Sequence, residues 1–92
     1  MNNLETSKIY DHDELKEIGK KFLKSIGCKN IQFEQCIKEQ YIHDVVGYKN
    51  DEPFVVECGA LDPIRLLTFM GFYKNRFFWL PYYNAKKIYL FP

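Results

Sequence analysis

Apolar and polar positions repeat with two different periods along the chain. In the first segment, apolar side chains recur every three or four positions, which predicts an amphipathic helix over residues 14–26. Asp11 can cap this helix with Glu14 as its capping-box partner, and Gly27 is expected to end it. The apolar stripe consists of Leu15, Ile18, Phe22 and Ile26.

The period then changes to two, which is typical of strands. Residues 31–37 alternate strictly between apolar and polar, and residues 41–48 form a second strand pattern. A polar stretch with turn chemistry, centred on Asn50 and Asp51, leads into a third strand at 54–58. We therefore expect three successive strands that pair as antiparallel neighbours.

The second half begins with another helix signal. Asp62 followed by Pro63 is typical of a cap and first turn, and residues 64–73 are apolar on nearly all sides. Such a helix is expected to be buried on more than one side. Short strands are predicted at 77–80 and 88–91.

The element order predicts an α/β (α+β) fold: one helix, three strands, a second helix and one or two further strands. A chain of 92 residues has the size of one domain, so we expect a single domain over 1–92 with a mixed central sheet flanked by helices. Its 47% apolar and 17% aromatic content is high for so small a monomer. This composition favours a homodimer.

The net charge of the chain limits which partners it can bind through electrostatic attraction. The net charge is only +1, so binding to nucleic acid must come from a local patch. The polar start of the chain does not resemble a secretory signal, and no apolar run approaches the length of a membrane span. The chain is therefore expected to be soluble and cytoplasmic, without a membrane partner.

Three cysteines occur without a C-x-x-C pair. They are expected to be buried free thiols, because neither a zinc site nor a secreted disulfide framework has this pattern. A disulfide between the first two remains open. The three are Cys28, Cys36 and Cys58.

Two acidic residues lie inside apolar strand patterns, where charge is costly. Asp44 directly precedes Val45 and Val46, and Glu57 directly follows Val55 and Val56. If the intervening hairpin turns near Asn50, the two carboxylates lie nearly opposite each other and would repel without a cation between them. Oxygen ligands suit Mg²⁺ or Mn²⁺, with the Cys58 carbonyl as a further ligand. Phosphodiester hydrolysis is the leading chemistry for such a site.

This pattern resembles the PD-(D/E)xK nuclease superfamily, and within it small archaeal Holliday-junction resolvases and related archaeal or viral nuclease-like proteins. Glu14 suits the family's helical acid, His43-Asp44 stands at the Pro-Asp position, and Glu57-Cys58-Gly59 stands at the (D/E)-x-K position. The resemblance implies a restriction-endonuclease-like fold. It also implies a metal-dependent DNA endonuclease with Glu14, Asp44 and Glu57 as catalytic residues.

The chain departs from this family where Gly59 replaces the motif lysine. That lysine is thought to orient water and stabilise the transition state, whereas glycine offers only a backbone N–H. A catalytically inactive nuclease-fold module for DNA binding or protein interaction is therefore the alternative. A purely structural homodimer is a third possibility.

Each candidate residue also has a plain structural interpretation. Glu14 can serve as the capping-box partner alone, and Asp44 and Glu57 can be satisfied by lysines. His43 is expected on the surface or a sheet face rather than as a ligand. Four lysines of the first helix can contact DNA phosphates or simply be solvated: Lys16, Lys20, Lys21 and Lys24.

Overall fold

The computed structural model describes residues 9–37, 41–82 and 88–91. The predicted turn at Lys38 and Glu39 lies outside these residues. The elements are α1 (His12–Ser25), β1 (Lys29–Cys36), β2 (Ile42–Lys49), β3 (Glu52–Cys58), α2 (Pro63–Tyr73), a 3-10 turn (Lys74–Arg76), β4 (Phe77–Leu80) and β5 (Tyr89–Phe91). Each predicted helix and strand is present, with bounds shifted by no more than two residues.

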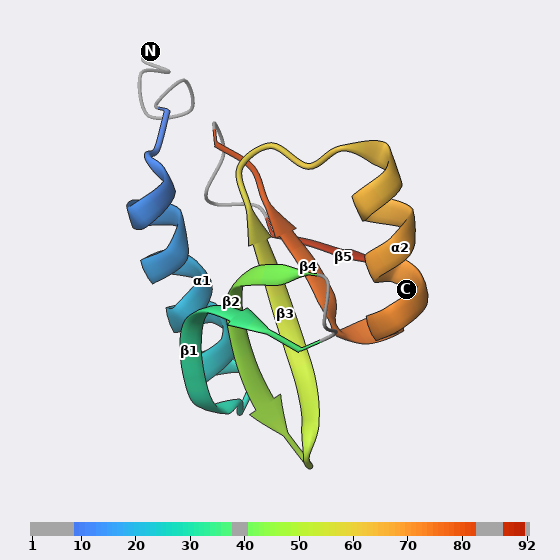
Figure 1. The fold of residues 1–92 in the computed structure, drawn as a ribbon. Coiled ribbons are helices and arrows are strands. Elements are labelled where there is room, and N and C mark those ends of the chain that lie inside the picture. Colours follow the sequence, from blue (N-terminus) through green and yellow to red (C-terminus); the bar gives the residue numbers. More distant parts are fainter. Residues whose placement is uncertain (1–8, 38–40, 83–87, 92) are drawn as a thin grey trace.

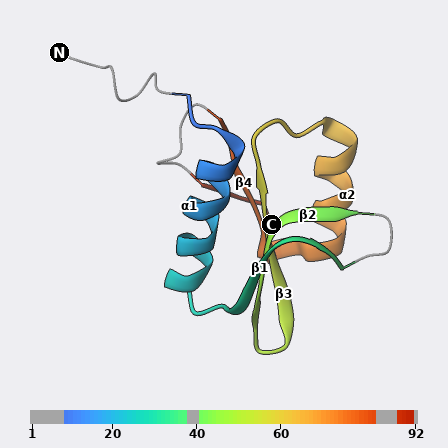
Figure 2. The same ribbon diagram turned by 60° about the vertical axis from the view of Figure 1, so that its left-hand side comes forward.

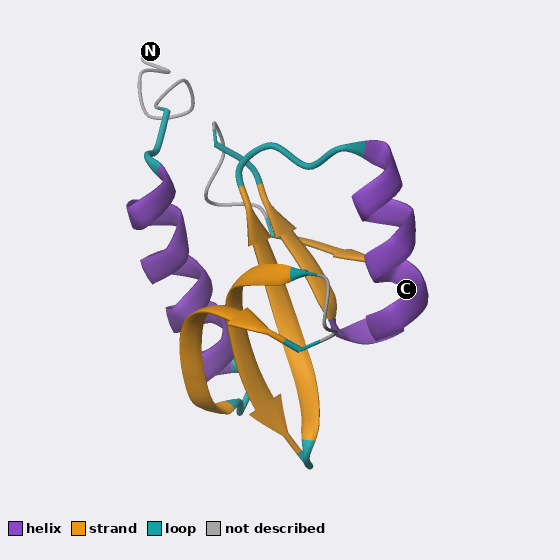
Figure 3. Cartoon of the chain, viewed as in Figure 1, coloured by secondary structure: helices purple, strands orange, loops and turns teal. Residues whose placement is uncertain are grey.

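The strands form one mixed sheet in the order β1-β2-β3-β4-β5 (Figures 1 and 3). The pairs β1–β2, β2–β3 and β4–β5 are antiparallel, whereas β3 and β4 are parallel. The parallel pair requires a crossover connection, which α2 supplies. The predicted α+β class with a mixed sheet between helices is confirmed.

The two helices cover opposite faces of the sheet (Figure 2). Neighbouring strand residues divide between two buried clusters, because successive side chains point to opposite faces. Val45 and Val56 pack with Leu15 and Leu23 of α1, in what we call the α1-side cluster. Val46 and Val55 belong to the α2-side cluster, which also contains Phe69, Tyr73 and Phe77. Both faces of β3 are therefore buried.

The start of α1 confirms its predicted cap. The Asp11 side chain accepts a hydrogen bond from the Glu14 backbone N–H at 2.8 Å, and the Glu14 carboxylate accepts one from the Asp11 N–H at 3.0 Å. Two of the N–H groups that a helix start leaves without partners are thereby satisfied. Gly27 follows the helix end with φ +100°, a conformation that favours glycine.

The hairpin between β2 and β3 turns at Asn50 and Asp51, as predicted. Both residues have positive φ, 54° and 64°, as in the two-residue turns whose twist matches that of antiparallel strands. The register then pairs Lys49 with Glu52 and Val45 with Val56. The ends of β2 and β3 away from this turn carry the candidate site.

One prediction about α2 is wrong. Phe69 and Tyr73 are buried, but Ile64 and Leu67 are 77% and 67% exposed, so the helix is buried on one side only. It lies against one face of the sheet, and no described element covers its outer side. No helix in the described ranges is long and apolar enough to cross a membrane.

The cysteines also correct the sequence analysis in part. No disulfide joins these three described cysteines, and Cys28 and Cys58 are buried as expected, but Cys36 is exposed. Cys36 ends an edge strand, and Glu34 two residues earlier has a positive φ of 55°. This local change of backbone ends the regular burial pattern after Phe33.

Candidate functional site

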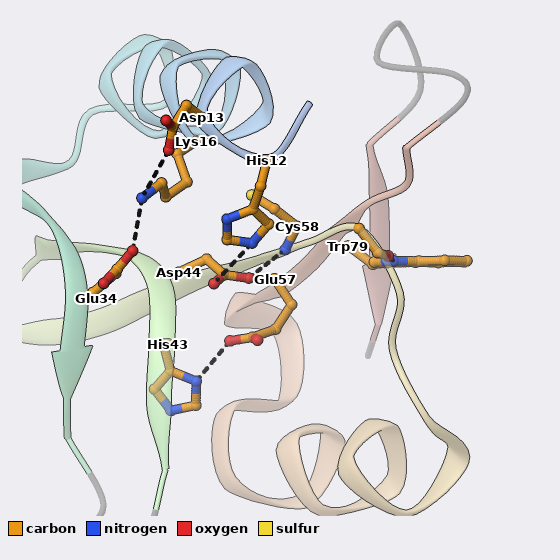
Figure 4. Close-up of polar contacts among 10 residues, drawn as sticks. His12, Asp13, Lys16, Glu34, His43, Asp44, Glu57, Cys58 and Trp79 are labelled. Atoms are coloured by element: carbon orange, nitrogen blue, oxygen red, sulfur yellow. Dashed lines mark hydrogen bonds and ion pairs between the residues drawn. The ribbon is translucent and has the colours of Figure 1, made fainter. Parts of the chain in front are cut away.

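The side-chain alternation of β2 is interrupted at the candidate site. His43 contacts Tyr73 on the α2 side of the sheet, whereas Asp44 contacts His12 at the start of α1. Val45 also faces α1, so two successive residues share one side. Glu57 of β3 contacts His43, and its carboxylate therefore lies on the α2 side, away from the contacts of Asp44 (Figure 4).

His43 is at the centre of a buried hydrogen-bonded network. Its Nδ1 lies 2.7 Å from Glu57 Oε2, and its Nε2 lies 2.7 Å from the Tyr73 hydroxyl. His43 is 0% exposed and Glu57 is 4% exposed. Of the two places expected for His43, the surface is wrong and a sheet face is right: it lies on the α2-side face, where α2 packs over it with the edge-on ring of Phe69.

Burial sets the protonation of this network. Loss of solvation, reinforced by the charge of Glu57, raises the pKa of Tyr73 to about 12, so the hydroxyl keeps its proton. It can then donate to His43 Nε2, while a proton on Nδ1 is donated to Glu57. Burial also raises the pKa of Glu57, against the opposing effect of the His43 hydrogen bond.

The raised pKa of Glu57 predicts that the stability of the protein depends on pH. A raised folded-state pKa means that the folded protein binds the Glu57 proton more tightly than the unfolded chain does. The resulting stabilisation is complete below the ordinary value of 4.5 and is lost as pH rises through the folded-state pKa. In urea unfolding from pH 4 to pH 7, wild type should lose stability relative to Glu57→Gln as pH rises. A difference that grows in favour of wild type would contradict this assignment.

Asp44 occupies a second, more open polar cluster on the α1 side. Its Oδ2 accepts a hydrogen bond from the Cys58 backbone N–H at 2.7 Å, and its Oδ1 lies 3.3 Å from His12 Nε2. The His12 and Asp44 side chains are 39% and 20% exposed. Asp44 thus joins the start of α1 to the ends of β2 and β3 (Figure 4).

Gly59, at the position of the motif lysine, is held in a conformation and a space that suit glycine. Its φ is +88°, and an added Cβ would lie 2.5 Å from Cζ of Tyr82. Its carbonyl accepts a hydrogen bond from the Trp79 indole at 2.6 Å, and its N–H donates to Leu80 at 2.8 Å. The ring of Tyr82 therefore covers the place where a side chain at this position would begin.

The remaining predicted residues lie on α1. Glu14 serves as the capping-box partner, which confirms its structural interpretation, and its catalytic role remains a prediction. Lys16 is turned inward, 2.7 Å from Glu34 and 3.3 Å from Asp13, with only 12% of its side chain exposed. The three lysines further along the helix are exposed: Lys20, Lys21 and Lys24.

The placement of the two carboxylates bears on the predicted metal. Glu57 is held by His43, and Asp44 by His12 and the Cys58 N–H, so a Mg²⁺ bound to both carboxylates would have to displace these contacts. Within the described ranges, no three His, Cys, Asp or Glu side chains are grouped as metal ligands. Cys58 contributes its N–H to Asp44, and a role for its carbonyl remains a prediction.

Sequence reasoning did not identify three residues of this region. His12 follows the helix cap, but nothing in the sequence places it beside Asp44. Tyr73 appears in the sequence only as part of an apolar helix, although a tyrosine buried in such a helix needs a hydrogen-bond partner. Tyr82 lies in a turn, and its position over Gly59 depends on how the chain leaves β4.

Comparisons with models of protein families, with curated proteins and with solved structures found no match to the chain.

Proposed function

We propose that the chain is a DNA-binding module on a restriction-endonuclease-like fold, and that it binds DNA without cleaving it. Three features support the fold assignment: the order of elements, the antiparallel β1–β2–β3 unit, and the crossover through α2 to a parallel β4. The helices cover the two faces of the sheet, as that fold implies. This topology supports the proposed fold.

The observation that carries the proposal is the arrangement of Glu57 and Gly59. Glu57 is buried against His43 and directed away from Asp44, and Tyr82 covers the motif-lysine position. The carboxylate and the lysine-bearing position that cleavage would require are both taken up by packing. A binding role needs neither.

The exposed side of α1 supplies the cations for binding. No described ion pair engages Lys20, Lys21 or Lys24, whereas Lys16 is neutralised by Glu34 and Asp13. The acidic residues of α1 (Asp13, Glu14 and Glu17) lie in its first half, so these lysines form a local excess of positive charge in its second half. Lysine ammonium groups on one helix side can contact successive phosphates of a DNA backbone.

Binding tests this proposal through its salt dependence. We expect labelled duplex DNA to bind with an affinity that falls as salt rises, at about 0.9 in log–log slope for each phosphate contact. Replacing Lys20, Lys21 and Lys24 together with glutamine should reduce that slope by about 2–3. Lys74→Gln, on the α2 side of the molecule, is the matched control and should leave the slope unchanged. Binding that is absent, or equal in the triple variant, would contradict the proposal.

Metal-dependent DNA cleavage is the second candidate. It is favoured by the 20% exposure of Asp44, which lies beside His12 on the open side of the site. To test it, wild type and the Asp44→Asn variant are each incubated with Mg²⁺ or Mn²⁺ and labelled branched, single-stranded or duplex DNA. Cleavage by wild type that is lost in this variant would replace the proposed function with this one. The homodimer stays a prediction of the sequence.

A further inference from the structure

A basic pocket lies where α1 ends and β1 begins, away from the carboxylates of the candidate site. It has a volume of about 250 Å³. Lys20 and Lys24 lie one helical turn apart on α1, and Lys29 lines the pocket from the start of β1. The lining is Lys20, Lys24, Cys28, Lys29, Asn30 and Ile31.

The charges around this pocket are all of one sign. Three lysines and no carboxylate line it, and no described ion pair engages any of the three. The closest described interaction of their ammonium groups is that of Lys20, 5.8 Å from the centre of the Phe33 ring. Positively charged side chains that line one pocket repel each other, and a bound anion removes this repulsion.

Neutral groups complete the pocket. The Cys28 side chain is buried, and burial raises the pKa of its thiol, so it stays protonated and does not offset the lysines. Asn30 offers a side-chain amide that can donate hydrogen bonds. The carbonyl of Ile26 beyond the end of α1 accepts from Lys49 at 3.0 Å, which weakens the negative end of the helix dipole near the pocket.

We infer that this pocket binds a phosphomonoester dianion and, resting on the proposed function, that it takes the terminal phosphate of a DNA strand. A phosphomonoester carries nearly two negative charges at neutral pH, whereas each internal phosphodiester carries one. A lining with three lysines and no carboxylate therefore favours the monoester. A small free phosphate ester has the same chemistry and is the other source of such a ligand.

The test compares three internally labelled single strands of one sequence, with hydroxyl ends, a 5′-phosphate or a 3′-phosphate. We expect one phosphorylated strand to bind about tenfold more tightly than the hydroxyl strand, as one charge-assisted contact would give. Lys24→Gln combined with Lys29→Gln should reduce this ratio to about one. Lys21→Gln removes a charge from the same helix outside the pocket lining, and it should weaken all three strands alike.

Failure of the inference and failure of the proposed function give different results. Equal, salt-dependent binding of all three strands would overturn the inference and leave DNA binding intact. If no strand binds, the proposed function is contradicted. Calorimetric titration with adenosine monophosphate, and with adenosine as the control, then tests whether the pocket binds a phosphate ester. Binding of the monophosphate alone, lost in the double variant, would support a small phosphate ester as the ligand. If neither compound binds, the inference that the pocket binds a phosphomonoester is contradicted.

Discussion

Replacing Glu57 with alanine should lower the free energy of unfolding by about 1–3 kcal/mol, the cost of leaving a buried hydrogen-bonding group without its partner, with a further loss from the cavity. The carboxylate lies 2.7 Å from Nδ1 of His43, and both side chains are buried. Alanine would leave that nitrogen without a partner and open a cavity beside Tyr73. The α2-side cluster would lose the polar network around which it packs.

Equilibrium urea unfolding followed by circular dichroism measures this loss. Glu52→Ala, at the exposed start of the same strand, is the matched control and should change stability by no more than about 0.5 kcal/mol. Glu57→Gln keeps the shape and a hydrogen-bonding group, so it should cost less than Glu57→Ala. If the alanine variant is as stable as the control, Glu57 is not held by His43 as described.

Gly59→Ala is expected to lower the free energy of unfolding by about 1–2 kcal/mol, mainly through backbone strain and to a smaller extent through contact with Tyr82. An alanine at φ +88° costs about 1–2 kcal/mol in backbone strain. Its Cβ would also lie 2.5 Å from the far end of the Tyr82 ring, but Tyr82 is 37% exposed and its side chain can turn aside, so the steric part is small. Gly59→Lys meets the same ring, so we expect it to destabilise the protein rather than restore the cleavage motif.

A double-mutant cycle with Tyr82→Ala separates the two effects. In the Tyr82→Ala background the steric part is absent, so Gly59→Ala should cost only the backbone part, about 1–2 kcal/mol. Thermal and urea unfolding of the four proteins give the coupling energy. A zero coupling energy would mean that Tyr82 does not restrict position 59, which would reopen that position to a lysine.

The elements were predictable because their signals are local. The capping box of Asp11 and Glu14, the Asp62-Pro63 start of α2 and the turn at Asn50 and Asp51 each depend on residues close in sequence. A one-sided apolar stripe or a period of two then places each segment in a helix or a strand. The α+β class follows from the order of these segments.

The site was less predictable because it depends on contacts between distant segments. Regular alternation puts Asp44 and Glu57 on one face of the sheet, but the interruption between Asp44 and Val45 separates their carboxylates. The partner of His43 in α2, Tyr73, lies 30 residues further along the chain. No local sequence pattern predicts such pairings, and none predicts that Tyr82 covers Gly59.

The burial of β3 on both faces has a consequence for how this chain can change during evolution. Val55, Val56, Glu57 and Cys58 are consecutive and all buried, because α1 covers one face of the strand and α2 the other. An exposed residue can be exchanged by itself, but a substitution in this segment needs a compensating change in whichever helix packs on that side. Neutral drift is therefore slowest in β3 and fastest on exposed positions such as those of edge strand β1. Divergent relatives would then share the β3 segment with this chain even after their surface lysines had been replaced.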